Sequence, residues 1–369
     1  MFSNLKREYR YNMRLAVPIM LGQLGHVLVA FVDNVMVGAL GPEALAAVSL
    51  GNTFIYIALS LGLGFSFAIT PLVAEADAQA DHKQARSYLK HGFYLNLMLG
   101  LSLCVAVVVA APILKSMNQP PVVVELAVSY MQIVAFSLVP LMLFQSFKQF
   151  TDGKSETKLP LYASIAANVV NVLLNYLLIY GVWFVPAMGV DGAALATLIS
   201  RVLMLAGLWI VLMQVRKMKF YILTFSKAAF HKKTFKTIMH QGIPTALQMF
   251  FEVLLFTSAI FIAGYMGVVE QAANQITLNL ATTTFMVAVG LSVTATIRVG
   301  NQKGKKNFAE LRRVAQSIFS LVLVVMFCFA IILYTLKSYL PFLYTQDLEV
   351  AALATQLLIV AALFQLSDG

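Results

Sequence analysis

Long apolar stretches recur along the chain and are separated by short polar segments. A helix needs about 20 mostly apolar residues to cross a bilayer. Runs such as residues 104–111 lack the alternation of β-barrel strands, so the stretches predict helices. Turn-forming pairs such as Gly41-Pro42 and Asp152-Gly153 mark the connections. Ten spans are predicted, at residues 14–38, 45–70, 90–115, 122–147, 159–183, 189–214, 241–264, 272–297, 314–337 and from 348 to the end.

The composition agrees with a membrane protein. The 369 residues are 60% hydrophobic and 11% charged, with a mean hydropathy of +0.82. A soluble globular protein carries about 45–50% apolar and about 25% charged residues. These values exclude a soluble enzyme, a disordered chain and a disulfide-rich secreted domain. Cys104 and Cys328 lie inside apolar runs, which indicates small hydrophobic side chains and neither a redox pair nor a metal site.

The basic residues predict the orientation. If the N-terminus is cytoplasmic, 23 of the 26 Lys and Arg residues lie in cytoplasmic segments, Lys115 and Lys337 lie outside, and Arg201 lies within a span. This asymmetry follows the positive-inside rule. The net charge of +10 is then explained by topology and by contact with anionic membrane lipid, without nucleic acid as a partner.

An internal repeat predicts the architecture. One constant offset in the numbering, which we call the repeat offset, places Pro18 on Pro244, Gly38 on Gly264 and Arg86 on Arg312. Six helices separate the equivalent positions, so the repeat is parallel, as in some transporters. We therefore expect an all-α integral membrane protein with two six-helix lobes. The amino-terminal lobe spans residues 1–214, a basic cytoplasmic linker spans 215–240, and the carboxyl-terminal lobe spans 241–369.

The second lobe is shorter than the first in this chain. By the repeat offset, it would need two more helices to match the amino-terminal lobe. The repeat therefore predicts twelve helices in the full protein, about ten of them in this chain.

Ionisable residues inside the predicted spans are the first candidates for function, because such residues are expensive in a bilayer. Asp33, Glu252 and Asp368 are the acids in this group, with His26 as a weaker member. By the repeat, Glu252 is equivalent to position 26, about two helical turns before Asp33, so the two acids share a face at different depths. A structural alternative is a carboxylate buried with a partner for packing. Arg201 either neutralises an acid or fixes its helix, and we favour the structural role.

Further polar, aromatic and proline residues are placed to line a cavity or to bend helices. Intramembrane amides either join helices or line a wet cavity, and neither reading is preferred. They are Asn171, Asn175, Gln248, Gln275 and Asn279. Phe251 and Met286 either form an adaptable wall or pack ordinarily. Pro18 and Pro244 free a backbone carbonyl in the first helix of each lobe, which permits bending or a static kink.

The usual enzyme motifs are absent. The sequence contains no GxGxxG, Walker A, HExxH or GxSxG motif, and its five histidines lack metal-ligand spacing. We expect no enzyme activity and no cofactor. Without an ATP-binding domain, the energy for transport would come from an ion gradient.

Several segments resemble the multidrug and toxic compound extrusion family, in particular its bacterial NorM-like branch. They are PIMLGQL, FVDNVMVGALG, FTDGKSETKLP, NVLLNYLLIYG, GIPTALQMFFEV, AANQITLNLAT and FQLSDG, in this order along the chain. The resemblance implies that Asp33 is the amino-lobe acid of proton coupling, and that Glu252 and Asp368 form a carboxyl-lobe pair that binds Na+ or H+. It also implies that Asn171 and Asn175 lie in the cavity, although many relatives carry Asp where Asn175 stands.

The resulting prediction is a secondary active transporter that exports cationic drugs in exchange for Na+ or H+ by alternating access. It would lie as a monomer in the bacterial cytoplasmic (inner) membrane, with its N-terminus in the cytoplasm. The alternative within the same superfamily is a lipid-linked oligosaccharide flippase, which would need several cationic residues in the cavity, whereas Arg201 alone lies mid-span. An intramembrane enzyme or a symmetric channel fits the residues less well.

Overall fold

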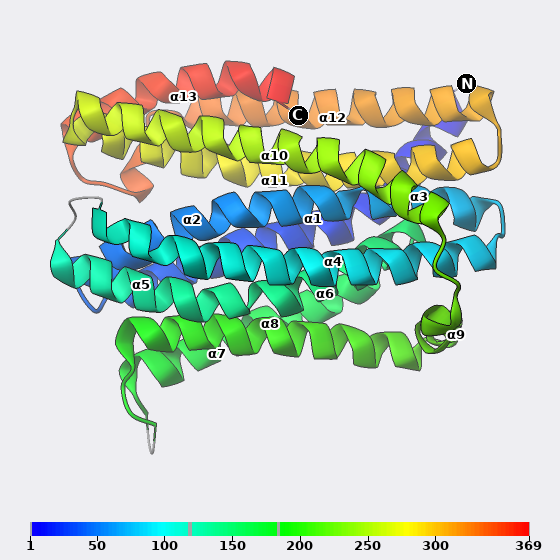
Figure 1. Ribbon diagram of the computed structural model, residues 1–369. Helices are drawn as coiled ribbons and strands as arrows, with labels where there is room; N and C mark the ends of the chain where they lie inside the picture. The colour runs from blue at the N-terminus through cyan, green and yellow to red at the C-terminus, as the bar shows by residue number, and fades with distance from the viewer. Residues whose placement is uncertain (1, 117–119, 183–184, 369) are drawn as a thin grey trace.

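The computed structural model describes residues 2–116, 120–182 and 185–368, and the regular elements in these ranges are helices (Figure 1). The α-helices are α1 (Phe2–Gly38), α2 (Pro42–Phe67), α3 (Ile69–Ala78), α4 (His82–Ala110), α5 (Pro121–Phe136), α6 (Leu138–Gly153), α7 (Lys158–Tyr180), α8 (Gly189–Gln214), α9 (Arg216–Thr224), α10 (Lys232–Met266), α11 (Val268–Gly304), α12 (Phe308–Leu336) and α13 (Leu348–Asp368). Short 3-10 helices lie at Ala111–Ser116, Phe225–Lys227 and Leu340–Leu343.

Ten helical segments of the described chain are long and apolar enough to cross a membrane, which confirms the number predicted from the sequence. Two of them are interrupted, between α2 and α3 at Ala68 and between α5 and α6 at Ser137. The helices extend beyond the apolar stretches at one end of the bundle. Helix α1 begins at Phe2 instead of 14, and α11 ends at Gly304 instead of 297. The apolar stretch covers only the part of a helix that lies inside the bilayer. The helix itself can continue into water, where its end can be capped.

The repeat predicted from the sequence is present in the helix boundaries. Both ends of α12 follow the ends of α4 by the repeat offset, and both ends of α11 follow those of the α2–α3 pair by the same offset. Helix α10 follows α1 at nearly the same offset. The copies differ at one point, because α11 is continuous where α2 and α3 are separated at Ala68. The two copies therefore share a helix order as well as a residue pattern.

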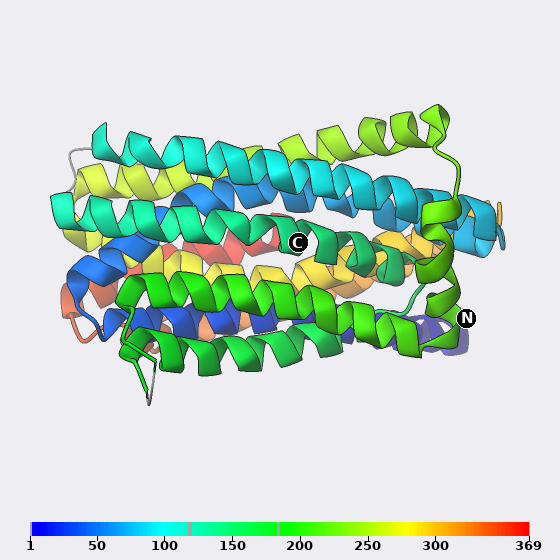
Figure 2. The same ribbon diagram turned by 60° about the horizontal axis from the view of Figure 1, so that its bottom comes forward.

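The helices lie side by side in two groups, which we call the amino half (α1–α8) and the carboxyl half (α10–α13). Figure 1 shows the carboxyl half as an upper group and the amino half below it, and Figure 2 is turned so that the amino half comes forward. The halves meet where α10 packs on α2 and where α11 packs on α3 and α1. The N-terminus and α9 lie at the same end of the bundle (Figure 1), which we call the basic end.

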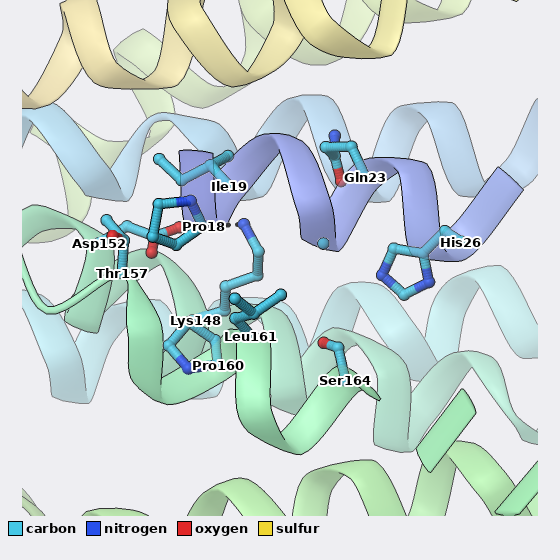
Figure 3. A pocket seen from close by; sticks show the side chains of 11 residues that line it. Pro18, Ile19, Gln23, His26, Lys148, Asp152, Thr157, Pro160, Leu161 and Ser164 are labelled. Carbon is cyan, nitrogen blue, oxygen red and sulfur yellow. Dashed lines mark hydrogen bonds and ion pairs between the residues drawn. The ribbon is translucent and has the colours of Figure 1, made fainter. Parts of the chain in front are cut away.

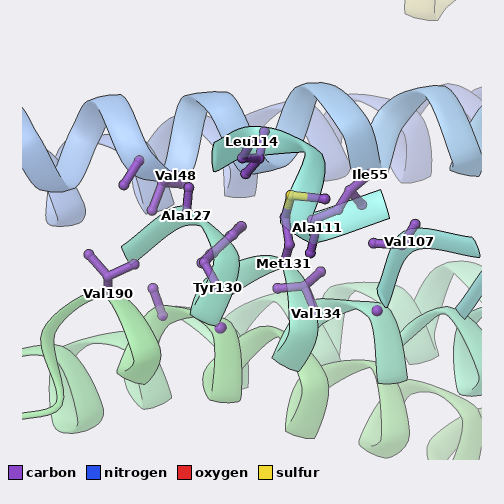
Figure 4. Packing of buried hydrophobic residues seen from close by; sticks show 14 of the residues in the cluster. Val48, Ile55, Val107, Ala111, Leu114, Ala127, Tyr130, Met131, Val134 and Val190 are labelled. Atoms are coloured by element: carbon purple, nitrogen blue, oxygen red, sulfur yellow. The ribbon is translucent and has the colours of Figure 1, made fainter. Parts of the chain in front are cut away.

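The largest apolar core lies inside the amino half, between α2, α4, α5 and α8 (Figure 4). Ile55 and Met131 are almost completely buried there. The opposite face of α4 is apolar but exposed, with Met98 at 64% and Val109 at 70%. A helix with both faces apolar and only one of them buried in protein is typical of a span that contacts lipid. Cys104 is buried and Cys328 is exposed, and both are free.

The segment between α8 and α10 is held against the amino half. The hydroxyl of Tyr221 on α9 lies 2.6 Å from His82 Nδ1 and accepts a hydrogen bond from Lys154 Nζ at 2.9 Å. Lys90 Nζ donates to the carbonyls of Ser226 and Ala228. Helix α10 then begins at Lys232, before its apolar stretch. The basic segment is therefore a docked connection and continues directly into a spanning helix.

Candidate functional site

Asp33 on α1 and Asn175 on α7 meet inside the amino half. The Asn175 side-chain amide donates a hydrogen bond to Asp33 Oδ1, and its nitrogen also lies 3.3 Å from Asn171 Oδ1. Asn175 is fully buried, Asn171 is nearly so, and Asp33 is half-buried. Asn175 Oδ1 is buried without a hydrogen-bond partner among the described residues. Three residues singled out in the sequence thus form one polar cluster.

Arg201 on α8 adds a positive charge to this cluster. Its guanidinium interacts electrostatically with the Asp33 carboxylate and lies near the side chains of Tyr56 and Tyr130. Its Nη1 atom also donates to Ser137 Oγ at 2.7 Å, at the interruption between α5 and α6. Arg201 therefore has contacts that suit both roles considered for it, near an acid and at a helix break.

The sequence alone did not identify the tyrosines of this cluster. Tyr130 donates to Asn52 Oδ1 at 3.0 Å, and its side chain is buried among apolar residues of the core (Figure 4). A buried tyrosine needs a partner for its hydroxyl. The mid-span Asn52 was the one available signal, because an amide inside an apolar run also needs a partner.

A polar stripe continues from this cluster along α7 toward the basic end. Its members, spaced by four, three and four residues, share one helix face. They are Ser164, Asn168, Asn171 and Asn175. Ser164 borders a small cavity of about 10 Å³, which lies between α1, α6 and α7 (Figure 3). This volume accommodates about one water molecule.

The buried pair Lys148–Asp152 lines the same cavity. Lys148 Nζ lies 3.0 Å from Asp152 Oδ2, while Asp152 Oδ1 is buried without a partner in the described chain. Asp152-Gly153 was predicted to be a connection, but the two residues form the last turn of α6 and are buried. The physical reason is close packing, because a Cβ at Gly153 would lie 2.8 Å from the carbonyl oxygen of Thr70. His26 and Gln23 lie on the α1 side of the cavity (Figure 3).

The candidates of the carboxyl half are less enclosed in protein. Glu252 on α10 is half-buried, and its neighbours Gln248 and Phe251 are exposed. On α11, Gln275 Nε2 donates to Asn279 Oδ1 at 3.2 Å, and both residues are exposed, while Met286 is half-buried. Asp368 is the last residue of α13, and its side chain lies outside the described residues.

Two further features bear on the predicted cation site and on bending. Within the described ranges, no three His, Cys, Asp or Glu side chains form a cluster that could hold a metal ion. The side chain of Asp368 lies outside the described residues, so a Na+ site at Glu252 and Asp368 stays a prediction. Pro18 and Pro244 both lie inside continuous helices, α1 and α10, so each helix passes its proline without a break.

Ten spans, a parallel repeat and a half-buried carboxylate held by buried amides define a multi-pass helical membrane protein of the transporter class. A family model described as MatE matches residues 18–177 and 244–369, two segments whose starts are separated by the repeat offset. The chain belongs to this family, the multidrug and toxic compound extrusion family.

Curated relatives and solved structures agree with this assignment. The chain is 31% identical to "Probable multidrug resistance protein NorM" of Agrobacterium fabrum, over 87% of this chain and 69% of that protein. It is 30% identical to "Multidrug resistance protein MdtK" of Yersinia pseudotuberculosis, over 86% of this chain and 70% of that protein. The eukaryotic MATE transporter AtDTX14 matches with a TM-score of 0.87 at 18% identity, over 99% of this chain and 81% of its own. An outward-facing multidrug resistance MATE family transporter matches with a TM-score of 0.83 at 20% identity, over 96% and 78%.

Proposed function

We propose that the protein exports organic cations and drugs across a bacterial cytoplasmic membrane in exchange for Na+ or H+, with its N-terminus in the cytoplasm. Membership of the family and the printed names of the NorM and MdtK relatives support export of drugs. They favour this function over flipping of a lipid-linked oligosaccharide. The distribution of Lys and Arg supports the orientation.

The observation that carries the proposal is the Asp33 carboxylate held by Asn175. A carboxylate has about four acceptor positions, so one hydrogen bond from Asn175 leaves capacity for a proton or a cation. Arg201 sets the local charge and Asn171 orients Asn175. Negative charge in a low-dielectric site is weakly screened and attracts whichever cation reaches it.

Competition for this charge couples the two fluxes. A proton or Na+ on the carboxylates removes the attraction for an organic cation, and arrival of the organic cation displaces the coupling ion. Asp33 serves the amino half in this scheme, and Glu252 with Asp368 serves the carboxyl half. Gln248, Gln275, Asn279, Phe251 and Met286 supply polar and adaptable contacts for the substrate.

The test uses the full-length protein in proteoliposomes loaded with ethidium, with Na+ and pH gradients imposed separately. We expect efflux to need at least one gradient. Asp33→Asn, Glu252→Gln and Asp368→Asn keep size and remove charge, and each should strongly reduce efflux while insertion stays normal. Glu270→Gln at the start of α11 is the control, because that residue lies outside both groups of candidates.

The pattern of losses assigns the coupling site. Loss in Asp33→Asn alone would place coupling in the amino half, and loss in Glu252→Gln and Asp368→Asn alone would place it in the carboxyl half. Efflux without any gradient, or unchanged coupling in all three variants, would overturn the proposal.

A further inference from the structure

Part of the contact between the two halves lies toward the basic end. Near this end, Leu15 and Ile19 of α1 form an apolar cluster with Val293 and Ile297 of α11. Farther along α1, Leu28 is 63% and Phe31 57% exposed, whereas Leu15 is 6% and Ile19 4% exposed. The halves are therefore packed together at the end where α1 begins.

Glycines allow the backbones to approach closely in the same region. A Cβ at Gly300 of α11 would lie 3.0 Å from the carbonyl oxygen of Pro71, and a Cβ at Gly304 would lie 2.4 Å from that of Glu75. On the other side of the contact, a Cβ at Gly64 of α2 would lie 2.7 Å from the carbonyl oxygen of Thr245. Backbone at these distances leaves no room for water between the halves.

A buried ion pair lies within this packed region. Arg298 on α11 pairs through Nη2 with Glu8 on α1, and its Nη1 donates to Asn12 Oδ1 at 2.9 Å. The guanidinium also lies over the Tyr11 ring, 4.5 Å from its centroid. Arg298 is 6% exposed, Glu8 is 7% exposed and Asn12 is fully buried. The positive-inside rule explains an exposed loop arginine, but it does not explain one that is buried against the other half.

The pair extends to a third helix. Asn12 Nδ2 donates to Ser317 Oγ of α12 at 3.1 Å, so Asn12 connects α1 to two helices of the carboxyl half. Lys303, farther along α11 than Arg298, pairs through Nζ with Glu75 Oε2 at 2.9 Å, and both side chains are more exposed there. Glu8, Asn12, Arg298 and Ser317, which we call the α1–α11 clamp, form the buried part of this polar contact.

We propose that the α1–α11 clamp determines conformation: it holds the basic end closed in the state described here and must open for that end to admit substrate. The proposal rests on the proposed alternating-access export, and with the proposed orientation the clamp closes the cytoplasmic side. Both charges lose hydration when the halves meet and regain it when they separate. Desolvation thus offsets much of the attraction, so the two states can be close in free energy.

Glu8 and Asn12 lie before Pro18 on α1, and Asp33 lies after it. The proline lacks the backbone N–H that would continue the hydrogen-bond ladder of the helix at this point. The first part of α1 therefore holds the contact with the carboxyl half, and the part after Pro18 holds the contact of Asp33 with Asn175.

The test measures the distance between spin labels on the two halves, in protein without substrate. Lys83→Cys and Ala309→Cys place the labels on exposed, repeat-equivalent positions at the basic end, after Cys104→Ala and Cys328→Ala. The unaltered clamp should give a single short distance, with any open population below about a tenth. Glu8→Gln and Arg298→Met should each increase the longer-distance population roughly tenfold.

The control is Arg313→Met, which removes an exposed arginine of α12 that pairs only within its own helix. It should leave the distances unchanged. The exchange of both charges, Glu8→Arg with Arg298→Glu, should recover part of the short-distance population, and it tests the pair even if Arg298→Met fails to fold. The clamp would be overturned if Glu8→Gln kept the short distance and Arg298→Met also kept it. If Arg298→Met does not fold, a short distance in Glu8→Gln and no recovery by the exchange would overturn it. This readout needs no transport, so a protein that exports no cation would refute the proposed function and leave the clamp result intact.

Discussion

Asp81 and Asn307 cap equivalent helices by the same hydrogen bond, one in each copy of the repeat. Asp81 Oδ1 accepts from the N–H of Gln84 at 2.9 Å, and Asn307 Oδ1 accepts from the N–H of Glu310 at 3.1 Å. The residues before them, Ala80 and Lys306, both have a left-handed φ of 54°. The duplication therefore extends to the geometry of the turn that precedes α4 and α12.

Because the two caps are equivalent, we expect loss of either one to reduce the stability of the protein by a similar amount. Asp81→Ala and Asn307→Ala should each destabilise the protein by about 1 kcal/mol, because each leaves a backbone N–H at a helix start without its acceptor. Thermal unfolding of the purified protein in detergent measures the loss. Asn307→Asp keeps an acceptor and should unfold like the parent. A loss in one half alone would contradict equivalence of the caps.

The Asp33–Asn175 contact predicts a graded loss of transport. Asn175→Leu removes the donor to Asp33 and should lower coupled efflux by roughly 10- to 100-fold, since hydrogen bonds to charged groups contribute about 1.5–3 kcal/mol. Asn171→Leu removes only the acceptor that orients Asn175 and should have a smaller effect. Ethidium efflux from proteoliposomes gives both values. Equal activity of Asn175→Leu and the parent would show that this contact does not serve transport.

Replacement of glycine by alanine should have opposite effects on stability at the contact between the halves and away from it. Gly64→Ala places a methyl group 2.7 Å from a backbone oxygen of Thr245 and should destabilise the protein by about 1–3 kcal/mol. Gly207→Ala on α8 meets only Ala163 Cβ at 4.0 Å and should be neutral or stabilising by up to about 1 kcal/mol. Unfolding temperatures of the two variants in detergent decide the matter. Similar values for both would mean that the halves are not closely packed at Gly64.

We expect removal of the Lys154 side chain, just after α6, to destabilise the protein by an amount that does not depend on pH near neutrality. Burial opposes its charged form, but hydrogen bonds to Asp77 and Tyr221 outweigh burial and raise the pKa of Lys154 above its usual 10.5. A raised pKa stabilises the fold below the unfolded value, and this contribution disappears as pH rises through the folded value. Lys154→Met should therefore destabilise the protein by about 1–3 kcal/mol, equally from pH 6 to pH 9.

Tyr221→Phe is the matched variant at the same contact. It removes the hydroxyl that accepts from Lys154 and also contacts His82 Nδ1, keeps the Lys154–Asp77 pair, and should destabilise by about 1–2 kcal/mol. Unfolding in detergent at several pH values measures both. A difference between Lys154→Met and the parent that shrinks between pH 6 and pH 9 would contradict the raised pKa.

Only some members of the candidate site were predictable from the sequence, and their contacts were not. Asp33, Asn171 and Asn175 stand out in the sequence because polar side chains in apolar spans are rare. Their meeting joins residues 142 positions apart and depends on how α1 and α7 are rotated toward each other. Asp152 was hidden by its neighbour, because an Asp-Gly pair usually marks a turn and here closes a buried helix end.

The sequence by itself determined the number of spans, the internal repeat and the segregation of basic residues. These properties depend on local composition and on a constant offset, which need no knowledge of packing. Only the tertiary structure decided that Arg298 pairs with Glu8 across 290 positions and that the halves close at the basic end. Such contacts follow from the tilt and rotation of whole helices, which depend on close approach at glycines such as Gly300. Hydropathy is averaged over a whole helix, so it does not depend on these angles and cannot predict them.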